Sequence, residues 1–102
     1  MLQVYISSIS GNPKVKSNQL YVMNLLSALH VPFEVRDIST SEKDKLFMSE
    51  ALKSRGKQVI APQLFSDEEY IGGYDELLEA NESESLSDFL RFNIHRTPAQ
   101  AV

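Results

Sequence analysis

The order of the first three predicted elements constrains the fold more than any other feature of this sequence. Leu2, Val4 and Ile6 alternate with other residues over a short segment, which predicts a β-strand. Residues 15–29 contain neither glycine nor proline and carry apolar side chains at helical spacing, which predicts a helix. Residues 33–38 alternate again and predict a second strand. A strand, a helix and a strand in this order require parallel pairing through a right-handed crossover.

A second helix is predicted after the second strand. Ser39 and Ser41 each stand three residues before an acidic residue, so two overlapping capping boxes mark its start. Apolar residues follow at helical spacing, and Gly56 is a typical residue just beyond a helix end. This helix returns the chain to the sheet for a third strand.

The last part of the domain is predicted to form a hairpin and two helices. Residues 63–65 and 70–71 are β-forming segments on either side of a short turn. One helix begins near Asp75, and Ser85 caps the last one. The complete order predicts an α/β fold with a four-stranded mixed sheet flanked by helices.

These elements fit one domain with one core. The pattern stops after Asn93, so we expect the domain to cover residues 1–93 and residues 94–102 to form a flexible tail. Four elements must meet on the sheet, and one apolar residue from each is expected to be buried. These residues are Leu26, Phe47, Leu64 and Phe89.

Composition excludes several classes of function. The sequence has no cysteine, so it has no disulfide, no thiolate nucleophile and no zinc-thiolate site. A net charge of -4 gives no broad basic surface, which argues against nucleic acid as a partner. There is no long apolar run and no charged leader, so we expect the protein in the cytoplasm with no membrane partner. We also expect a monomer. A chain this small can also diffuse into the nucleus, and the sequence leaves that open.

No catalytic or metal-binding residue stands out. His30 and His95 are isolated from other ligand-type residues, so we expect no metal site. The serines of the loop after the first strand lack the Gly-x-Ser-x-Gly pattern of a nucleophile elbow. We therefore expect neither a catalytic residue nor a cofactor.

Two stretches, residues 59–65 and 70–77, carry a resemblance that goes beyond periodicity. A proline opens the third strand, and Gly-Gly-x-Asp follows the fourth, which resembles the glutaredoxin signature. The resemblance implies a thioredoxin-like (glutaredoxin-like) fold, a cis peptide bond before the proline, and a ligand groove beside it. The residues it places at that groove are Ala61, Pro62, Gly72, Gly73, Tyr74 and Asp75. The glycines also fit a turn that requires positive φ, and Asp75 also fits a helix cap.

The catalytic half of the glutaredoxin pattern is missing. Where a glutaredoxin carries Cys-x-x-Cys or Cys-x-x-Ser after its first strand, residues 7–14 contain no thiol. This combination resembles the SH3 domain-binding glutamic acid-rich-like proteins, a thioredoxin-fold family without the catalytic motif. The segments that carry the likeness are 4–6, 35–39, 62–65, 73–75 and 86–90.

The resemblance implies a non-enzymatic protein-interaction or regulatory module, a redox-inactive homologue of glutaredoxin. Its implied partners are proteins, including SH3-domain or other signalling proteins. The four prolines, Pro13, Pro32, Pro62 and Pro98, never stand three residues apart, so no Pro-x-x-Pro ligand for an SH3 domain can form. The alternative is a glutathione-binding or glutathione-dependent thiol oxidoreductase-related protein. The sequence retains the side of the groove that carries Gly-Gly-x-Asp and lacks the cysteine side, so we expect weak or no glutathione binding.

Overall fold

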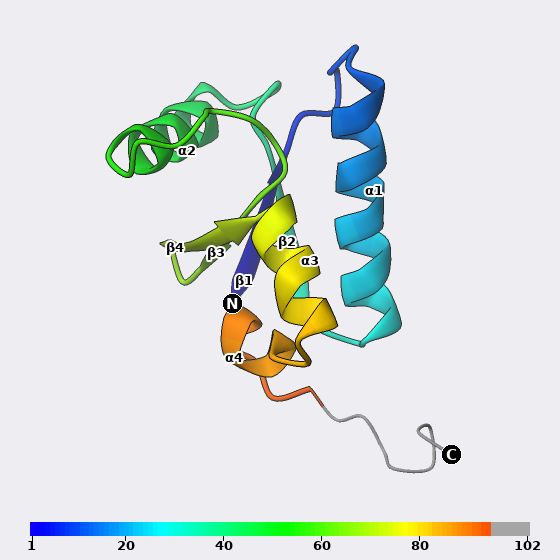
Figure 1. The fold of residues 1–102 in the computed structure, drawn as a ribbon. Coiled ribbons are helices and arrows are strands. Elements are labelled where there is room, and N and C mark those ends of the chain that lie inside the picture. The colour runs from blue at the N-terminus through cyan, green and yellow to red at the C-terminus, as the bar shows by residue number, and fades with distance from the viewer. Residues whose placement is uncertain (95–102) are drawn as a thin grey trace.

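The computed structural model describes residues 1–94 as a four-stranded sheet with helices on both faces (Figure 1). The elements in chain order are β1 (Leu2–Ile6), α1 (Pro13–Ala28), β2 (Phe33–Asp37), α2 (Glu42–Lys53), β3 (Gln63–Ser66), β4 (Glu69–Gly73), α3 (Tyr74–Glu82) and α4 (Leu86–Leu90). The strand order is β2-β1-β3-β4. β1 pairs with β2 in parallel, while β1 with β3 and β3 with β4 pair antiparallel. The predicted mixed sheet and its parallel crossover are confirmed.

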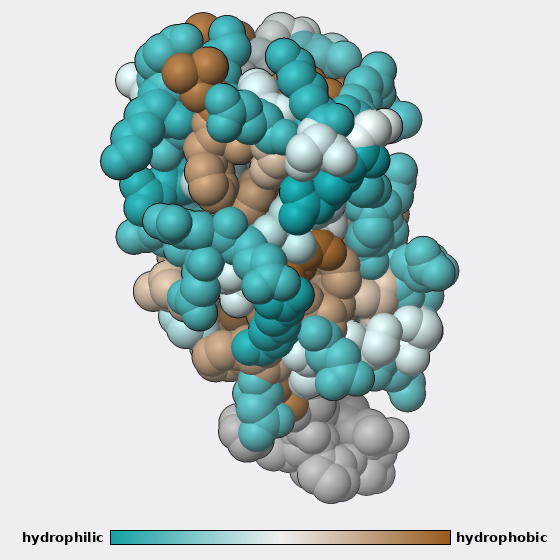
Figure 2. Space-filling view, turned by 90° about the vertical axis from the view of Figure 1, so that its left-hand side faces the viewer, coloured by the Kyte–Doolittle hydropathy of each residue, from teal (hydrophilic) through white to brown (hydrophobic). Residues whose placement is uncertain are grey.

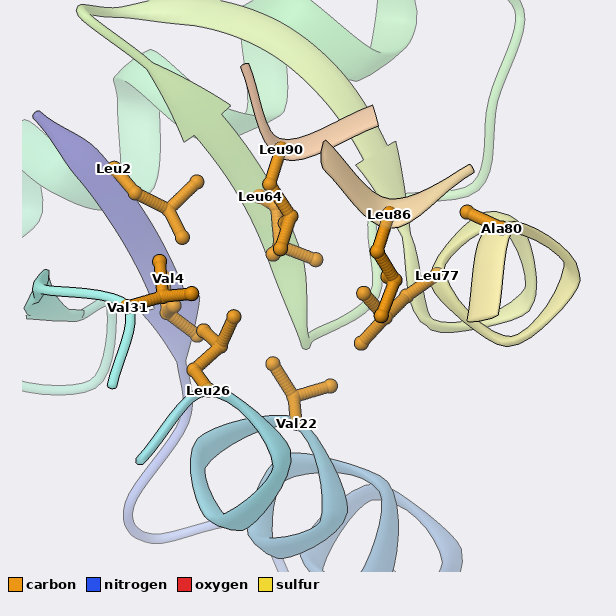
Figure 3. Packing of buried hydrophobic residues seen from close by; sticks show 10 residues of the cluster. All are labelled: Leu2, Val4, Val22, Leu26, Val31, Leu64, Leu77, Ala80, Leu86 and Leu90. Carbon is orange, nitrogen blue, oxygen red and sulfur yellow. The ribbon is translucent and has the colours of Figure 1, made fainter. Parts of the chain in front are cut away.

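The main core lies between the sheet and three helices, α1, α3 and α4 (Figure 3). Its buried members are Leu2, Val4, Val22, Leu26, Val31, Leu64, Leu77, Ala80, Leu86 and Leu90. Residues two apart on a strand face the same side, so Leu2 and Val4 of β1 both reach this core. Burial of Leu26 and Leu64 is confirmed.

A second, aromatic cluster lies on the other face of the sheet, under α2. It buries Tyr5, Phe65, Met48 and Leu52. The ring centroids of Tyr5 and Phe65 are 4.8 Å apart, and Phe47 packs partly buried at 5.2 Å from Phe65. α2 and α1 therefore lie on opposite sides of the strands, as Figure 1 shows.

The prediction that Phe47 and Phe89 are buried is wrong, because both rings are only partly covered. In α2 the fully buried positions are Met48 and Leu52. In α4 they are Leu86 and Leu90. The side of each helix that faces the sheet is therefore one residue away from the aromatic residue, and each ring covers the edge of a core instead of filling it.

The helix starts differ in detail from those predicted. α1 begins at Pro13, because the side chain of Asn12 accepts hydrogen bonds from the N–H groups of Lys14 and Val15. Ser41 caps α2 as predicted, with its hydroxyl accepting from the Asp44 N–H at 3.2 Å. Ser85 precedes α4, but its side chain makes no capping hydrogen bond.

Within the described residues, no helix is long and apolar enough to cross a membrane. The last described residue, Ile94, packs against the main core, and its N–H donates to the Ser87 hydroxyl. The core therefore extends one residue past the predicted boundary at 93. The rest of the predicted tail, 95–102, lies outside the described residues.

Candidate functional site

A groove of about 340 Å³ lies where the N-terminal end of α1, the loop before β3 and the start of α3 meet. α1 contributes Lys14, Val15 and Asn18, with Asn12 just before it. The second wall is formed by Lys57, Gln58, Ile60, Ala61 and Pro62, and residues 73–76 form the third. Three segments far apart in the sequence thus converge beside the opening of the third strand.

The structure brings five of the six predicted site residues together. Ala61, Pro62, Gly73, Tyr74 and Asp75 line the groove, and the Ala61–Pro62 peptide bond is cis, as predicted. Gly72 does not line it. Ala61 and Pro62 belong to the second wall, and Gly73, Tyr74 and Asp75 belong to the third.

Gly72 faces the opposite side of the sheet, toward α4. Its φ is +151°, and a Cβ there would lie 2.8 Å from ring atoms of Phe89 and 2.9 Å from Cβ of Glu76. Glycine is therefore required by packing as well as by backbone conformation. Of the two glycines, only Gly72 has the positive φ that the sequence predicted for the turn.

Gly73 borders the groove, but the space over it is already filled from within the chain. A Cβ on Gly73 would lie 2.8 Å from Oε1 of Gln63. The Gln63 side chain is buried, with Nε2 donating to the Ile60 carbonyl at 2.7 Å and Oε1 accepting from the Tyr70 hydroxyl at 2.9 Å. Gln63 and Tyr70 together form the floor of the groove, and no sequence motif had marked either residue.

Tyr70 stays a neutral hydrogen-bond donor throughout the physiological pH range. Burial, with the negative charge of Glu76 nearby, raises the pKa of Tyr70 to about 12. The guanidinium carbon of Arg55 and the ammonium nitrogen of Lys57 lie 5.1 and 5.9 Å from the ring centroid. Tyr70 is thus fixed by the hydrogen bond of its hydroxyl and by the cations over its ring.

The rim of the groove carries charges of both signs. Lys14 lies on one wall, Lys57 on the second, and Asp75 and Glu76 on the third. Lys57 and Glu76 form an ion pair at 3.8 Å. Glu76 also accepts a hydrogen bond from the Gly73 N–H at 2.7 Å and so caps α3. The interpretation of Asp75 as the cap is wrong, because the N-cap of α3 is Gly73 and Asp75 lies within the first turn, exposed at the rim.

The N-terminal end of α1 offers little to an anion. Asn12 Oδ1 accepts from the N–H groups of Lys14 and Val15 at 2.9 and 3.4 Å, so the first free donors of the helix are already used. The preceding loop is tied away from the groove, with the Ser7 N–H donating to Gln19 and the Ser8 N–H to Asp37. In the described part of the chain, no group of three metal-ligand side chains comes together.

A second hollow lies on the other face, between α2 and the β3–β4 hairpin. Phe47, Ala51, Phe65 and Tyr70 line it, with charged residues around them. The face turned to the viewer in Figure 2 is largely hydrophilic, and apolar surface shows between hydrophilic side chains. Two acidic residues that line this hollow, Asp67 and Glu69, are paired with the N-terminal amine and with Arg91, so their charges are partly compensated within the chain.

Comparisons with known proteins identify related sequences and structures. The model of the family described as "SH3-binding, glutamic acid-rich protein" matches residues 1–93. A curated relative, the SH3 domain-binding glutamic acid-rich protein homolog of Drosophila melanogaster, is 36% identical over 101 residues. That match covers 89% of this chain and 64% of the relative, so the chain spans less than two thirds of the relative's length.

Solved structures support the same fold. C. albicans actin interacting protein Aip5 is similar with a TM-score of 0.71 and 26% identity, over 87% of this chain and 86% of that one. A buckwheat glutaredoxin-glutathione complex is similar with a TM-score of 0.67 and 20% identity, over 88% of this chain and 76% of that one. The second likeness establishes a glutaredoxin-like, thioredoxin-like fold. With a family match over nearly its whole length, the chain belongs to the SH3-binding, glutamic acid-rich protein family.

Proposed function

We propose that this chain is a non-enzymatic interaction module that holds an extended peptide segment of a protein partner in the groove between α1, the loop before β3 and α3. The family description supports protein partners as a class. The name of the similar structure, actin interacting protein Aip5, also points to a protein partner, which makes actin one partner to test. The observation that carries the proposal is the groove itself, which is built from three segments but contains no thiol.

The lining of the groove suits a peptide better than a reactive small molecule. The Ile60–Pro62 segment borders it, and polar side chains with charges of both signs stand on its rim. An extended peptide offers backbone groups to such a wall and side chains to the rim. A volume of about 340 Å³ accommodates only a short stretch, so we expect moderate affinity.

The proposal is tested by reversing rim charges. A variant with Lys14→Glu and Asp75→Lys keeps the net charge and alters two walls of the groove. The matched control, Lys53→Glu with Asp88→Lys, makes the same exchange at exposed positions outside the groove. Partners captured by the wild type, and purified actin, are then measured against both variants by calorimetry.

We expect the groove variant to lose binding by about tenfold or more and the control to keep it, because each rim charge contributes on the order of 1 kcal/mol to a contact it touches. Equal affinity of wild type and groove variant for every partner would refute the groove as the binding site. Circular dichroism of both variants checks that each is folded.

Glutathione-dependent thiol chemistry is the alternative, and the glutaredoxin-like fold is the observation that favours it. It requires a thiol or an activated hydroxyl beside the groove. A hydroxyethyl disulfide reductase assay distinguishes the two functions. Turnover above uncatalysed thiol exchange would support the alternative, and we expect none.

A further inference from the structure

The outer edge of β2 is an unpaired strand edge with a self-complementary sequence. β2 is the terminal strand of the order β2-β1-β3-β4, so within the described residues no strand pairs with its outer side. Natural edge strands usually carry features that prevent pairing with another chain, such as charges. The two charges at this edge, Glu34 and Arg36, have opposite signs, so they do not prevent pairing with a second copy that places an opposite charge against each of them.

The backbone register shows which groups point outward. The Ile38 N–H donates to the Ile6 carbonyl of β1 at 2.9 Å. Because alternate residues of a strand direct their backbone groups to opposite edges, Glu34 and Arg36 also face β1. The N–H and C=O of Val35 therefore point away from the sheet, at the middle of the edge.

The side chains at this edge are exposed on both faces. Val35 lies beside Val4 and so points to the α1 face, where it is 46% exposed. Glu34 and Arg36 point to the α2 face, where they are 46% and 42% exposed and paired with each other at 2.9 Å. The Arg36 guanidinium uses only Nη2 for this contact, and Nε has no partner among the described residues.

The neighbouring helix α1 carries one exposed leucine, Leu20. Tyr21 contacts Tyr74 of α3, with ring centroids 5.7 Å apart, which fixes the side of α1 that faces α3. Leu20 lies about 100° around the helix from Tyr21, on the side of α1 away from α3, and is 57% exposed in mid-helix. Leu20 and Val35 are thus two exposed apolar side chains on the α1 face of the sheet.

We propose that the β2 edge is a homodimerisation surface, on which a second copy of this chain pairs antiparallel about a two-fold axis at Val35. Val35 then forms a reciprocal hydrogen-bonded pair with its own counterpart, and Glu34 of each copy lies opposite Arg36 of the other. These two pairs fall at non-hydrogen-bonded positions, where side chains approach most closely. Only a centre at residue 35 makes both charge pairs attractive.

The pairing places both α1 helices on the same face of one continuous sheet. One short strand pair buries less than a standard stable interface, so the dimer is weak and forms at high micromolar to millimolar concentration. The monomer expected from the sequence is then the state at low concentration. The peptide groove lies at the other end of the sheet order and stays open, so this proposal is independent of the function proposed above.

A charge-reversal pair tests the proposal by sedimentation equilibrium. Glu34→Arg places two cations opposite each other at both pairs, and Arg36→Glu places two anions there, so each variant alone is expected to associate about tenfold more weakly than wild type or worse. When the two variants are mixed, both pairs become attractive again. The mixture is expected to regain affinity within about threefold of wild type. The intrachain Glu34–Arg36 pair is broken in both variants, so it cannot cause the recovery.

Control variants make the same charge changes on α2, as Glu50→Arg and Lys43→Glu, and are expected to associate like wild type. Circular dichroism confirms folding of all variants. In the wild type, the Val35 amide is expected to shift in NMR spectra as concentration rises. A wild type that stays monomeric at millimolar concentration would overturn the proposal. So would association that survives in each single variant, or a mixture no stronger than its components.

Discussion

Single residues in the Gly72–Gly73 turn are required for separate reasons, although the sequence shows them as one motif. Gly72 gives space to the Phe89 ring, and Gly73 gives space to the Gln63 side chain. The motif predicted the turn and the position of the groove. It could not show that one glycine serves the core, because that depends on where α4 packs.

Gly72→Ala is expected to destabilise the protein by about 2 to 4 kcal/mol. The new Cβ would lie 2.8 Å from the Phe89 ring and 2.9 Å from Cβ of Glu76, at a φ of +151° that side chains rarely adopt. Urea unfolding measures the loss. Gly11→Ala is the control, because a Cβ at Gly11 meets nothing within 4 Å, and a change within about 0.5 kcal/mol is expected. Equal stability of the two variants would contradict the packing role of Gly72.

Asp37 joins two loops at the end of β2. Its Oδ1 accepts hydrogen bonds from the N–H and hydroxyl of Ser39, at 3.0 and 2.6 Å, and from the Ser8 N–H at 3.2 Å. Burial by itself would raise the pKa of Asp37, but these hydrogen bonds outweigh it and lower the pKa from 3.8 to about 2. Nothing in the sequence pattern predicted this role.

The lowered pKa of Asp37 predicts a loss of stability in acid. A group with a lower pKa in the folded state stabilises the protein above its unfolded pKa of 3.8, and this contribution disappears as the pH falls toward about 2. Asp37→Asn removes the titrating group, so the drop in unfolding free energy between neutral pH and pH values near the folded pKa should be smaller than in wild type. Urea unfolding across this range measures it, with Asp75→Asn as an exposed control. If the unfolding free energy of Asp37→Asn falls as steeply with decreasing pH as that of the wild type, Asp37 is not the group responsible.

At the scale of whole elements, the sequence predicted the type and order of every helix and strand, and it failed on helix orientation. Alternation and helical spacing are local properties, so the elements could be recognised without tertiary information. Which side of α2 and α4 faces the sheet depends on packing. Both helices offer an aromatic residue next to another apolar one, Phe47 beside Met48 and Phe89 beside Leu90, and helical spacing alone does not show which of the two is buried.

The orientation of α4 predicts that Leu90 matters more than Phe89. Leu90 is 1% exposed in the main core, so Leu90→Ala is expected to cost about 3 kcal/mol through lost burial and a cavity. Phe89 is only partly buried, so Phe89→Ala should cost less, about 2 kcal/mol, although the side chain removed is larger. Urea unfolding of both variants measures the difference. A greater loss in Phe89→Ala would mean that the ring, and not Leu90, anchors α4 to the sheet.

At the scale of the whole molecule, the site is assembled from parts that the sequence predicted unequally. The Ala61–Pro62 and Gly73–Asp75 walls were recognised because they carry a motif. The α1 wall and the floor formed by Gln63 and Tyr70 were missed, because no local pattern marks them. A groove made by three distant segments becomes visible only once the fold brings them together.

The complete groove lets the strength of glutathione binding be argued from all three walls. The wall at Gly73 to Asp75 is retained, and Lys14 and Lys57 add positive charge that the motif did not predict. Against this, Lys57 is already paired with Glu76 at 3.8 Å, and Asn12 occupies the first N–H groups of α1. No cysteine exists to form a mixed disulfide.

We therefore predict that glutathione binds weakly, with a dissociation constant on the order of 1 mM or above, which corresponds to about -4 kcal/mol or weaker. A few hydrogen bonds and partly paired charges must offset the translational and rotational freedom that the ligand loses, and no covalent bond contributes. Amide shift perturbations during an NMR titration report the affinity and the location together. Asp75→Lys should weaken any binding further, while Asp88→Lys, outside the groove, should leave it unchanged. Saturation at micromolar glutathione, centred on Gly73 and Asp75, would contradict the prediction and favour glutathione-dependent chemistry over peptide binding.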